Sequence, residues 1–176
     1  MGKDEYAYVL EYLPFGPLDS KDRKPAAIIL TDSLGLLLVA LKKDAKVESG
    51  MKVYIGENKR EEVHHIIQRT TPDKLSGNGT NALNERISAI VRENEGIYIE
   101  IINRLGFINV RLHSLNLMPG VGKKMVQKIL EERNKGPFKS YSDFDTRVGF
   151  ASGIERSITE RINEELRGSD KYRIFT

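Results

Sequence analysis

The spacing of the apolar residues changes at a polar, glycine-containing linker, residues 72–81 (PDKLSGNGTN). Before the linker, short aliphatic and β-branched runs are separated by turn residues, at 5–13, 26–31, 34–41, 53–55 and 63–69. After the linker, Leu83, Ile87 and Ile90 recur at helical spacing. About five short strands with no long helix between them favour a small closed or partly open barrel over a sandwich.

We therefore expect an α+β protein with more than one domain. The spacing from Gly50 to the run at 53–55 resembles the glycine-to-strand entry of OB-type barrels. Residues 97–103 (IYIEIIN) alternate like a strand but lie among helical patterns, and we predict a helix there. The predicted parts are an OB-like β-barrel over 1–75, a linker with connecting helices over 76–110, and an all-α domain over 111–176.

The composition excludes several classes of site. The chain has 176 residues and no cysteine, so it holds no disulfide, no thiol nucleophile and no Cys-ligated zinc or iron–sulfur cluster. No apolar run approaches the roughly 18 residues of a membrane helix. The polar start of the chain has no secretory pattern. We expect a cytoplasmic protein without a membrane partner and without a cofactor.

The positive charge is concentrated in one segment. The whole chain has a net charge of +3, but residues 111–139 alone carry seven Lys or Arg against two acids, a net of +5. A charge run of this kind is usually a solvated helix face. The motif within the segment favours a polyanion partner instead.

Residues 112–133 read LHSLNLMPGVGKKMVQKILEER. Leu112, Leu115 and Met118 have the spacing of a short helix, and Pro119-Gly120-Val121-Gly122 predicts a tight turn before a second helix. The first turn of that second helix has free N–H groups, and helix N-termini bind phosphate. With Lys123 and Lys124 directly beside them, the segment predicts a phosphate-binding turn.

This segment closely resembles the helix–hairpin–helix motif, which grips a nucleic-acid backbone without reading bases. The resemblance implies phosphate contacts from the turn and from the basic residues that follow it, namely Gly120, Val121, Gly122, Lys123, Lys124 and Lys128. It also implies a monovalent cation held by backbone carbonyl groups of the turn, namely those of Asn116, Met118 and Val121.

A second, degenerate copy of the motif is predicted 33 residues downstream, at 152–158 (SGIERSI). Glu155 replaces the second glycine of the turn, so we expect this copy mainly to pack against the first. Gly153 and Arg156 are its candidate secondary contacts to nucleic acid.

The barrel could add single-strand binding by stacking bases on aromatic side chains. The 5–13 run places four residues on one predicted face, Tyr6, Tyr8, Leu10 and Tyr12. Its candidate contacts are Tyr8, Tyr12, Lys42 and Arg69, although aromatic side chains on strands more often pack than bind. His64 and His65 are adjacent, so we expect them to point to opposite faces and to hold no metal.

The whole chain is also similar to a family of small, mostly archaeal, uncharacterised proteins described as binding nucleotides or nucleic acid. Those proteins join an OB-like barrel to a helix–hairpin–helix domain. The residues that carry the similarity are the 6–13 start, Arg111–Leu115, Leu117–Lys124 and Ile129–Arg133. The resemblance implies the same two-part architecture here and brings no reaction with it.

Three functions follow, in order of preference. The first is a non-catalytic protein that binds DNA or RNA. The second is a protein–protein adaptor in a DNA-repair or RNA-processing complex. The third is a DNA glycosylase or nuclease, because some glycosylases combine this hairpin with a Lys and a downstream Asp. Lys124, Asp143 and Asp145 have tempting spacing for that chemistry, but the β-rich half does not match those all-helical enzymes.

Overall fold

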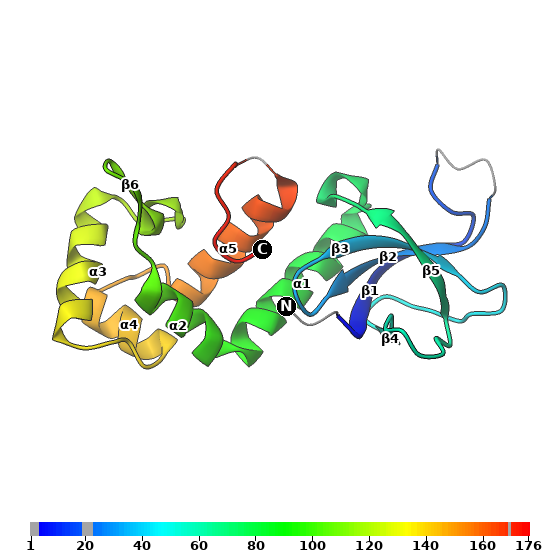
Figure 1. The fold of residues 1–176 in the computed structure, drawn as a ribbon, viewed down its shortest axis with the longest axis horizontal. Coiled ribbons are helices and arrows are strands. Elements are labelled where there is room, and N and C mark those ends of the chain that lie inside the picture. The colour runs from blue at the N-terminus through cyan, green and yellow to red at the C-terminus, as the bar shows by residue number, and fades with distance from the viewer. Residues whose placement is uncertain (1–3, 19–22, 169) are drawn as a thin grey trace. The chain divides into compact units, whose positions relative to one another are not determined.

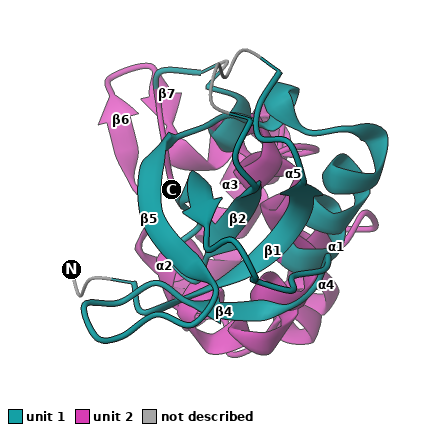
Figure 2. Cartoon of the chain, turned by 90° about the vertical axis from the view of Figure 1, so that its right-hand side faces the viewer, with its two compact units in different colours: residues 1–86, 166–171, 176 teal, residues 87–165, 172–175 magenta. Residues whose placement is uncertain are grey.

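A computed structural model describes residues 4–18, 23–168 and 170–176 (Figure 1). The chain divides into two compact units (Figure 2). Unit 1 consists of residues 1–86, 166–171 and 176, and unit 2 consists of residues 87–165 and 172–175. Unit 1 holds the main sheet, and unit 2 holds most of the helices.

The main sheet has five strands, as the sequence predicted: β1 (Tyr6–Leu13), β2 (Ala26–Thr31), β3 (Leu36–Leu41), β4 (Lys52–Tyr54) and β5 (Val63–Arg69). Their order is β4-β1-β2-β3-β5, and every neighbouring pair is antiparallel. The sheet curls into a half-barrel, and within the described residues its two outer strands, β4 and β5, do not pair with each other. Its inner face packs a cluster of small and β-branched residues that includes Val9, Ile29, Val39, Val53 and Val63.

A β-bulge at Leu10 changes the faces of β1. Tyr8 pairs with Leu30, whereas Tyr12 pairs with Ala27. Because Leu30 and Ala27 are three residues apart on β2, Tyr8 and Tyr12 lie on opposite faces of the sheet. The prediction that Tyr8, Leu10 and Tyr12 share a face is therefore wrong.

A bulge in β5 likewise changes the arrangement of the two adjacent histidines. Ala40 pairs with His65 and Leu41 pairs with Val63, which leaves His64 as the extra residue. The Nδ1 atoms of His64 and His65 are 2.8 Å apart. The rings therefore contact each other rather than pointing to opposite faces. Within the described residues, no group of three or more His, Asp or Glu side chains could hold a metal ion.

The remaining elements begin with a short 3-10 helix, η1 (Pro72–Lys74), and continue with α1 (Gly77–Glu93), α2 (Glu95–Arg104), β6 (Phe107–Asn109), β7 (Leu112–His113), η2 (Ser114–Leu117), α3 (Lys123–Lys135), α4 (Tyr141–Val148) and α5 (Ile154–Arg167). Helix α2 confirms the predicted helix at 97–103. None of the helices in the described ranges is long and apolar enough to cross a membrane.

Unit 2 is not all-helical, because β6 and β7 form a two-stranded ribbon. Leu112 lies in β7 rather than on the short helix predicted with Leu115 and Met118. The reason is local: the His113 side chain accepts a hydrogen bond from the backbone N–H of Leu115 at 3.1 Å. That bond caps the helix at His113, so η2 begins at Ser114 and spans a single turn.

Two buried or half-buried arginines of unit 2 hold chain segments together. Arg147 donates to the carbonyl oxygens at the end of α3, including that of Gly136 at 2.8 Å, and its guanidinium lies 4.6 Å from the ring centre of Phe138. Arg161 is 3% exposed and donates to Glu165, which is fully buried, at 3.0 Å. The Arg147 bonds therefore fix the end of α3, and the Arg161–Glu165 pair is a buried ion pair within α5.

Candidate functional site

The Pro119–Gly122 turn joins η2 to α3. Val121 is 5% exposed, and its backbone N–H donates to the Met118 carbonyl oxygen at 3.0 Å. Gly120 has φ +82°, a conformation that side chains other than glycine rarely adopt. A Cβ at Gly120 would also lie 3.2 Å from the Phe150 ring. The fold itself therefore requires glycine at position 120.

Substituting Gly120 should consequently reduce stability. We expect Gly120→Ala to lower the free energy of unfolding by about 1–2 kcal/mol, because the Cβ of alanine is strained at left-handed backbone angles. Urea unfolding followed by circular dichroism measures this loss. Gly122→Ser is the matched control and should not lower the unfolding free energy, because the backbone angles at position 122 suit any residue and serine is at least as good an N-cap as glycine. Equal losses in both variants would contradict the distinction.

Gly122 differs from Gly120 in that nothing in the fold requires it. It is the N-cap of α3 with φ −83°, which any residue can adopt, and as a glycine it has no side chain to cap the helix. A Cβ at Gly122 would meet nothing within 4 Å. Serine or aspartate is the stabilising choice at such a position. Glycine leaves the N-terminus of α3 open to an approaching group.

The first-turn amides of α3 face this open space. Val126 donates to the Gly122 carbonyl oxygen at 3.0 Å and starts the helical bonding. The N–H groups of Gly122, Lys123 and Lys124 have no acceptor among the described residues. These donors and the positive end of the helix dipole are suited to an anion.

The three lysines predicted at this site are not equivalent. Lys123 and Lys124 are exposed and form no ion pair within the described ranges. Lys128 instead lies 3.0 Å from the Glu132 carboxylate, which also accepts from Lys135 at 2.7 Å. The bonds from Lys135 and Lys128 lower the pKa of Glu132 to about 2. Lys128 is therefore already paired, whereas Lys123 and Lys124 are available.

The second predicted turn lies beside the first within unit 2. Gly153 has φ +80°, close to the value at Gly120, and the Ser157 hydroxyl donates to the Pro119 carbonyl oxygen at 2.6 Å. The two turns enclose a cleft of about 190 Å³ lined by Pro119, Gly120, Ser152, Arg156, Ser157 and Glu160. Arg156 is exposed and bonds Glu160 at 2.8 Å.

The second turn differs from the first because a carboxylate of the protein occupies its helix N-terminus. Asp145 accepts from the Ile154 N–H, the first amide of α5, at 2.8 Å. Burial raises the pKa of Asp145. Sequence reasoning missed this bond, because Asp145 and Ile154 are nine residues apart across a loop and no local pattern joins them.

Asp143, the other carboxylate of the enzyme alternative, also has a local role. It accepts from the Lys139 N–H at 2.9 Å and lies 3.2 Å from Arg147. The bond from the Lys139 N–H, together with Arg147, lowers the pKa of Asp143. Asp143 and Asp145 are thus both engaged in holding loops of unit 2.

The structure does not gather the candidate contacts of the barrel into one site. The Arg86 guanidinium covers the Tyr8 ring at 3.6 Å, and Tyr12 lies on the opposite face. The Lys42 ammonium donates to the Arg60 carbonyl oxygen. Arg69 ends the exposed strand β5. Tyr8 and Tyr12 therefore do not share a surface, and the Tyr8 ring and the Lys42 ammonium already have partners within unit 1.

The carbonyl groups of the predicted cation site are near one another in sequence, and one of them already accepts a backbone hydrogen bond. The Met118 oxygen accepts the Val121 N–H. The carbonyl groups of Asn116 and Val121 flank it along the chain. The cation remains a prediction, which a potassium titration of nucleic-acid affinity would test.

Comparison with known proteins gives three matches. The sequence model of a family described as "Protein of unknown function (DUF655)" matches residues 3–176. An uncharacterized protein of Methanocaldococcus jannaschii is 34% identical over 175 residues, which cover 98% of this chain and 79% of that protein. A crystal structure from Archaeoglobus fulgidus, assigned to the same family model, has a TM-score of 0.84 at 35% identity and covers 98% of this chain and 99% of that one. These matches confirm the resemblance to uncharacterised archaeal proteins.

Proposed function

Since the chain belongs to the DUF655 family of unknown function, its ligand has to be inferred from its own geometry, and we propose that it binds the phosphate backbone of DNA or RNA. The contact would be made by the Pro119–Gly122 turn and the N-terminus of α3. Lys123 and Lys124 would add charge, and no chemical step on the nucleic acid is proposed.

The observation that carries the proposal is the open N-cap at Gly122. Gly122 has ordinary backbone angles and free space where a Cβ would lie, so serine or aspartate would fit there and would cap the helix better than glycine does. A phosphate oxygen approaching the amides of Gly122, Lys123 and Lys124 does benefit, because a side chain there would stand in its way.

The order of elements supports the interpretation of residues 114–135 as a helix–hairpin–helix motif. A one-turn helix, a glycine turn and the 13-residue helix α3 follow one another, and a second glycine turn packs beside the first. For unit 1, a curled five-stranded sheet with an open seam is consistent with an OB-like barrel. The scattered barrel contacts lead us to assign the phosphate contact to unit 2.

The direct test is binding of labelled single- and double-stranded DNA and RNA oligonucleotides at two salt concentrations. Backbone contact predicts similar affinities for unrelated sequences and a steep loss of affinity as salt rises. The preferred nucleic acid would identify the substrate class. Absence of binding to all four probes at low salt would reject the proposal.

A substitution at Gly122 separates the binding role from the fold. In Gly122→Asp, the new carboxylate would cap α3 and raise the unfolding free energy by a few tenths of a kcal/mol. The same carboxylate would occupy the phosphate position, so we expect affinity to fall by at least about tenfold. Fluorescence anisotropy and urea unfolding measure the two effects.

Gly122→Ser is the matched control, because serine caps the helix without adding charge. Its affinity should lie between those of the wild type and Gly122→Asp. If Gly122→Asp bound oligonucleotides as tightly as the wild type, the N-terminus of α3 would not be the phosphate site.

A further inference from the structure

The ribbon of β6 and β7 in unit 2 ends in an exposed apolar tip that the proposed phosphate contact does not use. Val110 and Arg111 are the two turn residues of the ribbon, and Val110 is 98% exposed. Phe107 of β6 is 71% exposed, although its ring centre lies 4.9 Å from that of His113. Two large apolar side chains therefore face solvent on one short ribbon.

Nothing in the described part of the fold requires valine at the tip. Short turns between strands usually hold Gly, Asn, Asp or Ser, which suit the backbone or bond to it. Asn109 supplies such a bond, because its side-chain oxygen accepts the Arg111 N–H at 2.9 Å. Val110 has almost all of its surface in solvent, so it adds little packing. An apolar side chain in this position gains stability only from a partner that covers it.

The base of the ribbon is fixed, so the tip has a defined position on unit 2. Ser114 donates to the Gly106 carbonyl oxygen through its N–H at 2.9 Å and through its hydroxyl at 2.7 Å. Arg133 of α3 donates to the Leu105 carbonyl oxygen at 2.8 Å. These bonds attach the ribbon to the helix whose N-terminus carries the proposed phosphate contact. Figure 1 shows β6 and the start of α3 at the same end of unit 2.

The charge of this part of the chain favours a polyanion. Residues 101–130, which include the ribbon, the glycine turn and most of α3, contain five Lys or Arg and no acid. Arg104 is already paired with Glu100. Arg111 at the tip is exposed and forms no ion pair among the described residues. An apolar tip beside an available cation matches nucleic acid, which presents phosphates and the apolar faces of bases together.

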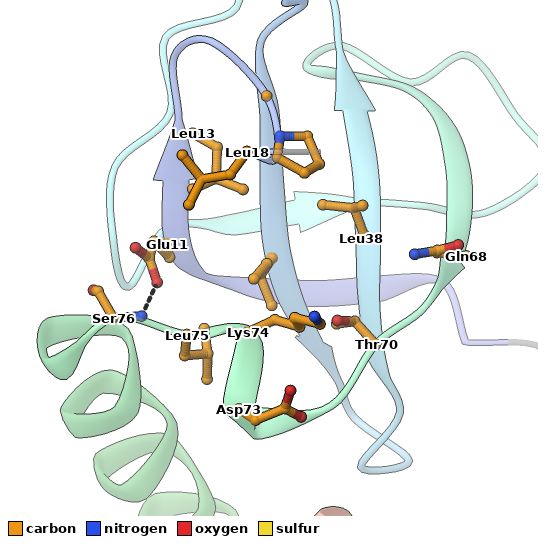
Figure 3. Close-up of a pocket in the computed structure, with 13 residues that line it drawn as sticks. Glu11, Leu13, Leu18, Leu38, Gln68, Thr70, Asp73, Lys74, Leu75 and Ser76 are labelled. Atoms are coloured by element: carbon orange, nitrogen blue, oxygen red, sulfur yellow. Dashed lines mark hydrogen bonds between the residues drawn. The ribbon is translucent and has the colours of Figure 1, made fainter. Parts of the chain in front are cut away.

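A cavity of unit 1 is unsuited to the same partner (Figure 3). Its volume is about 610 Å³, and its charged lining residues are two acids, Glu11 and Asp73, against Lys74 alone. The hydrogen bond from the Thr71 hydroxyl lowers the pKa of Asp73, so this carboxylate is negative at neutral pH. A phosphate would be repelled there, and a second contact to nucleic acid is therefore expected in unit 2.

We propose that the ribbon tip is a wedge that enters the base stack of a nucleic acid held at the N-terminus of α3. This inference rests on the proposed phosphate contact. Val110 would lie between two neighbouring bases, Phe107 would contact a displaced base, and Arg111 would meet an adjacent phosphate. Wedging costs unstacking energy, and that cost is least where the stack is already interrupted. The wedge therefore predicts a preference for a gapped duplex over an intact one.

The test measures binding of the full chain to a labelled duplex in two forms, intact and with a single-nucleotide gap, made in DNA and in RNA. We expect the gapped form to bind at least about tenfold more tightly. Val110→Asn, which places a common turn residue at the tip, should reduce that preference to about twofold, mainly through weaker binding of the gapped form. Val110→Leu should keep the preference. A fluorescent base beside the gap, which brightens when it is unstacked, should brighten with the wild type and not with Val110→Asn.

Ile97→Asn is the matched control, because Ile97 of α2 is also an apolar residue of unit 2 and is 59% exposed; it should keep the preference. Equal binding of the two forms by the wild type, or an unchanged preference in Val110→Asn, would overturn the wedge and leave the backbone contact standing. Phosphatidylserine vesicles that bind the wild type but not Val110→Asn would overturn it too, and would assign the tip to a membrane surface. If neither form bound at low salt, the phosphate contact itself would be rejected.

Discussion

Replacing Lys123 and Lys124 together with glutamate is expected to lower affinity for every oligonucleotide by about two orders of magnitude at low salt. Both side chains are exposed beside the open N-terminus of α3 and form no ion pair among the described residues. Reversing their charge turns two attractions for phosphate into repulsions. The slope of log affinity against log salt should also fall by about two. Titration of labelled oligonucleotides at several salt concentrations measures both quantities.

Lys46→Glu with Lys59→Glu is the control for net charge. Both residues are exposed lysines in loops of unit 1, so this variant changes the total charge by the same amount. It should bind almost as the wild type does. If the two double variants lost affinity equally, the effect would come from total charge, and the turn would have no special role.

The largest stability effect is expected from Glu165→Ala, at about 3–5 kcal/mol. Glu165 is fully buried and accepts from Arg161 at 3.0 Å, from the Ile174 N–H at 2.7 Å and from the Phe175 N–H at 3.0 Å. Removing the carboxylate would leave the buried Arg161 without its principal charge partner. It would also release the 172–175 segment from α5. Urea unfolding followed by circular dichroism measures the loss.

Glu160→Ala provides the comparison on the same helix. Glu160 pairs with Arg156 at the same four-residue spacing, but both side chains are largely exposed. Exposed pairs contribute little, so we expect a change below about 1 kcal/mol. Similar losses in the two variants would show that burial of the Arg161–Glu165 pair does not set its contribution.

Periodicity in the sequence predicted the elements that depend on a continuous pattern. The five strands appear where short apolar runs occur between turn residues, and the predicted second helix of the 112–133 segment is α3, with Val126 and Ile129 buried. The helix at 97–103 was correctly predicted from its neighbours, although its own residues alternate like a strand. Tertiary context decides such short segments.

Features set by pairing between distant segments could not be predicted. The bulge at Leu10 depends on the register with β2 and inverts an alternation that looked regular in the sequence. The bulge at His64 depends on the register with β3. The ribbon of β6 and β7 is too short to leave a pattern. Local periodicity carries no information on register, so these predictions failed or were absent.

The same distinction holds in the candidate site, where features of one continuous segment could be predicted and contacts between distant residues could not. The turn, its positive φ at Gly120 and the exposed Lys123 and Lys124 follow from a continuous motif. The pairing of Lys128 with Glu132 was open to prediction, because the two residues have the four-residue helical spacing of an ion pair. The bond from Ile154 to Asp145 was not, because it closes a loop between two helices.

The Asp145 bond has a consequence for how the two similar turns can vary over evolution. In the first turn Gly120 is required by the fold, whereas under the proposed phosphate contact the unfilled N-terminus at Gly122 would be constrained mainly by binding. The second turn is completed by a carboxylate of its own chain, so it is constrained by stability alone. In a saturation-mutagenesis survey, substitutions near Gly122 would therefore reduce function while preserving protein abundance. Substitutions at Asp145 would reduce abundance first, so under the proposed function the first turn would serve recognition and the second turn would serve stability.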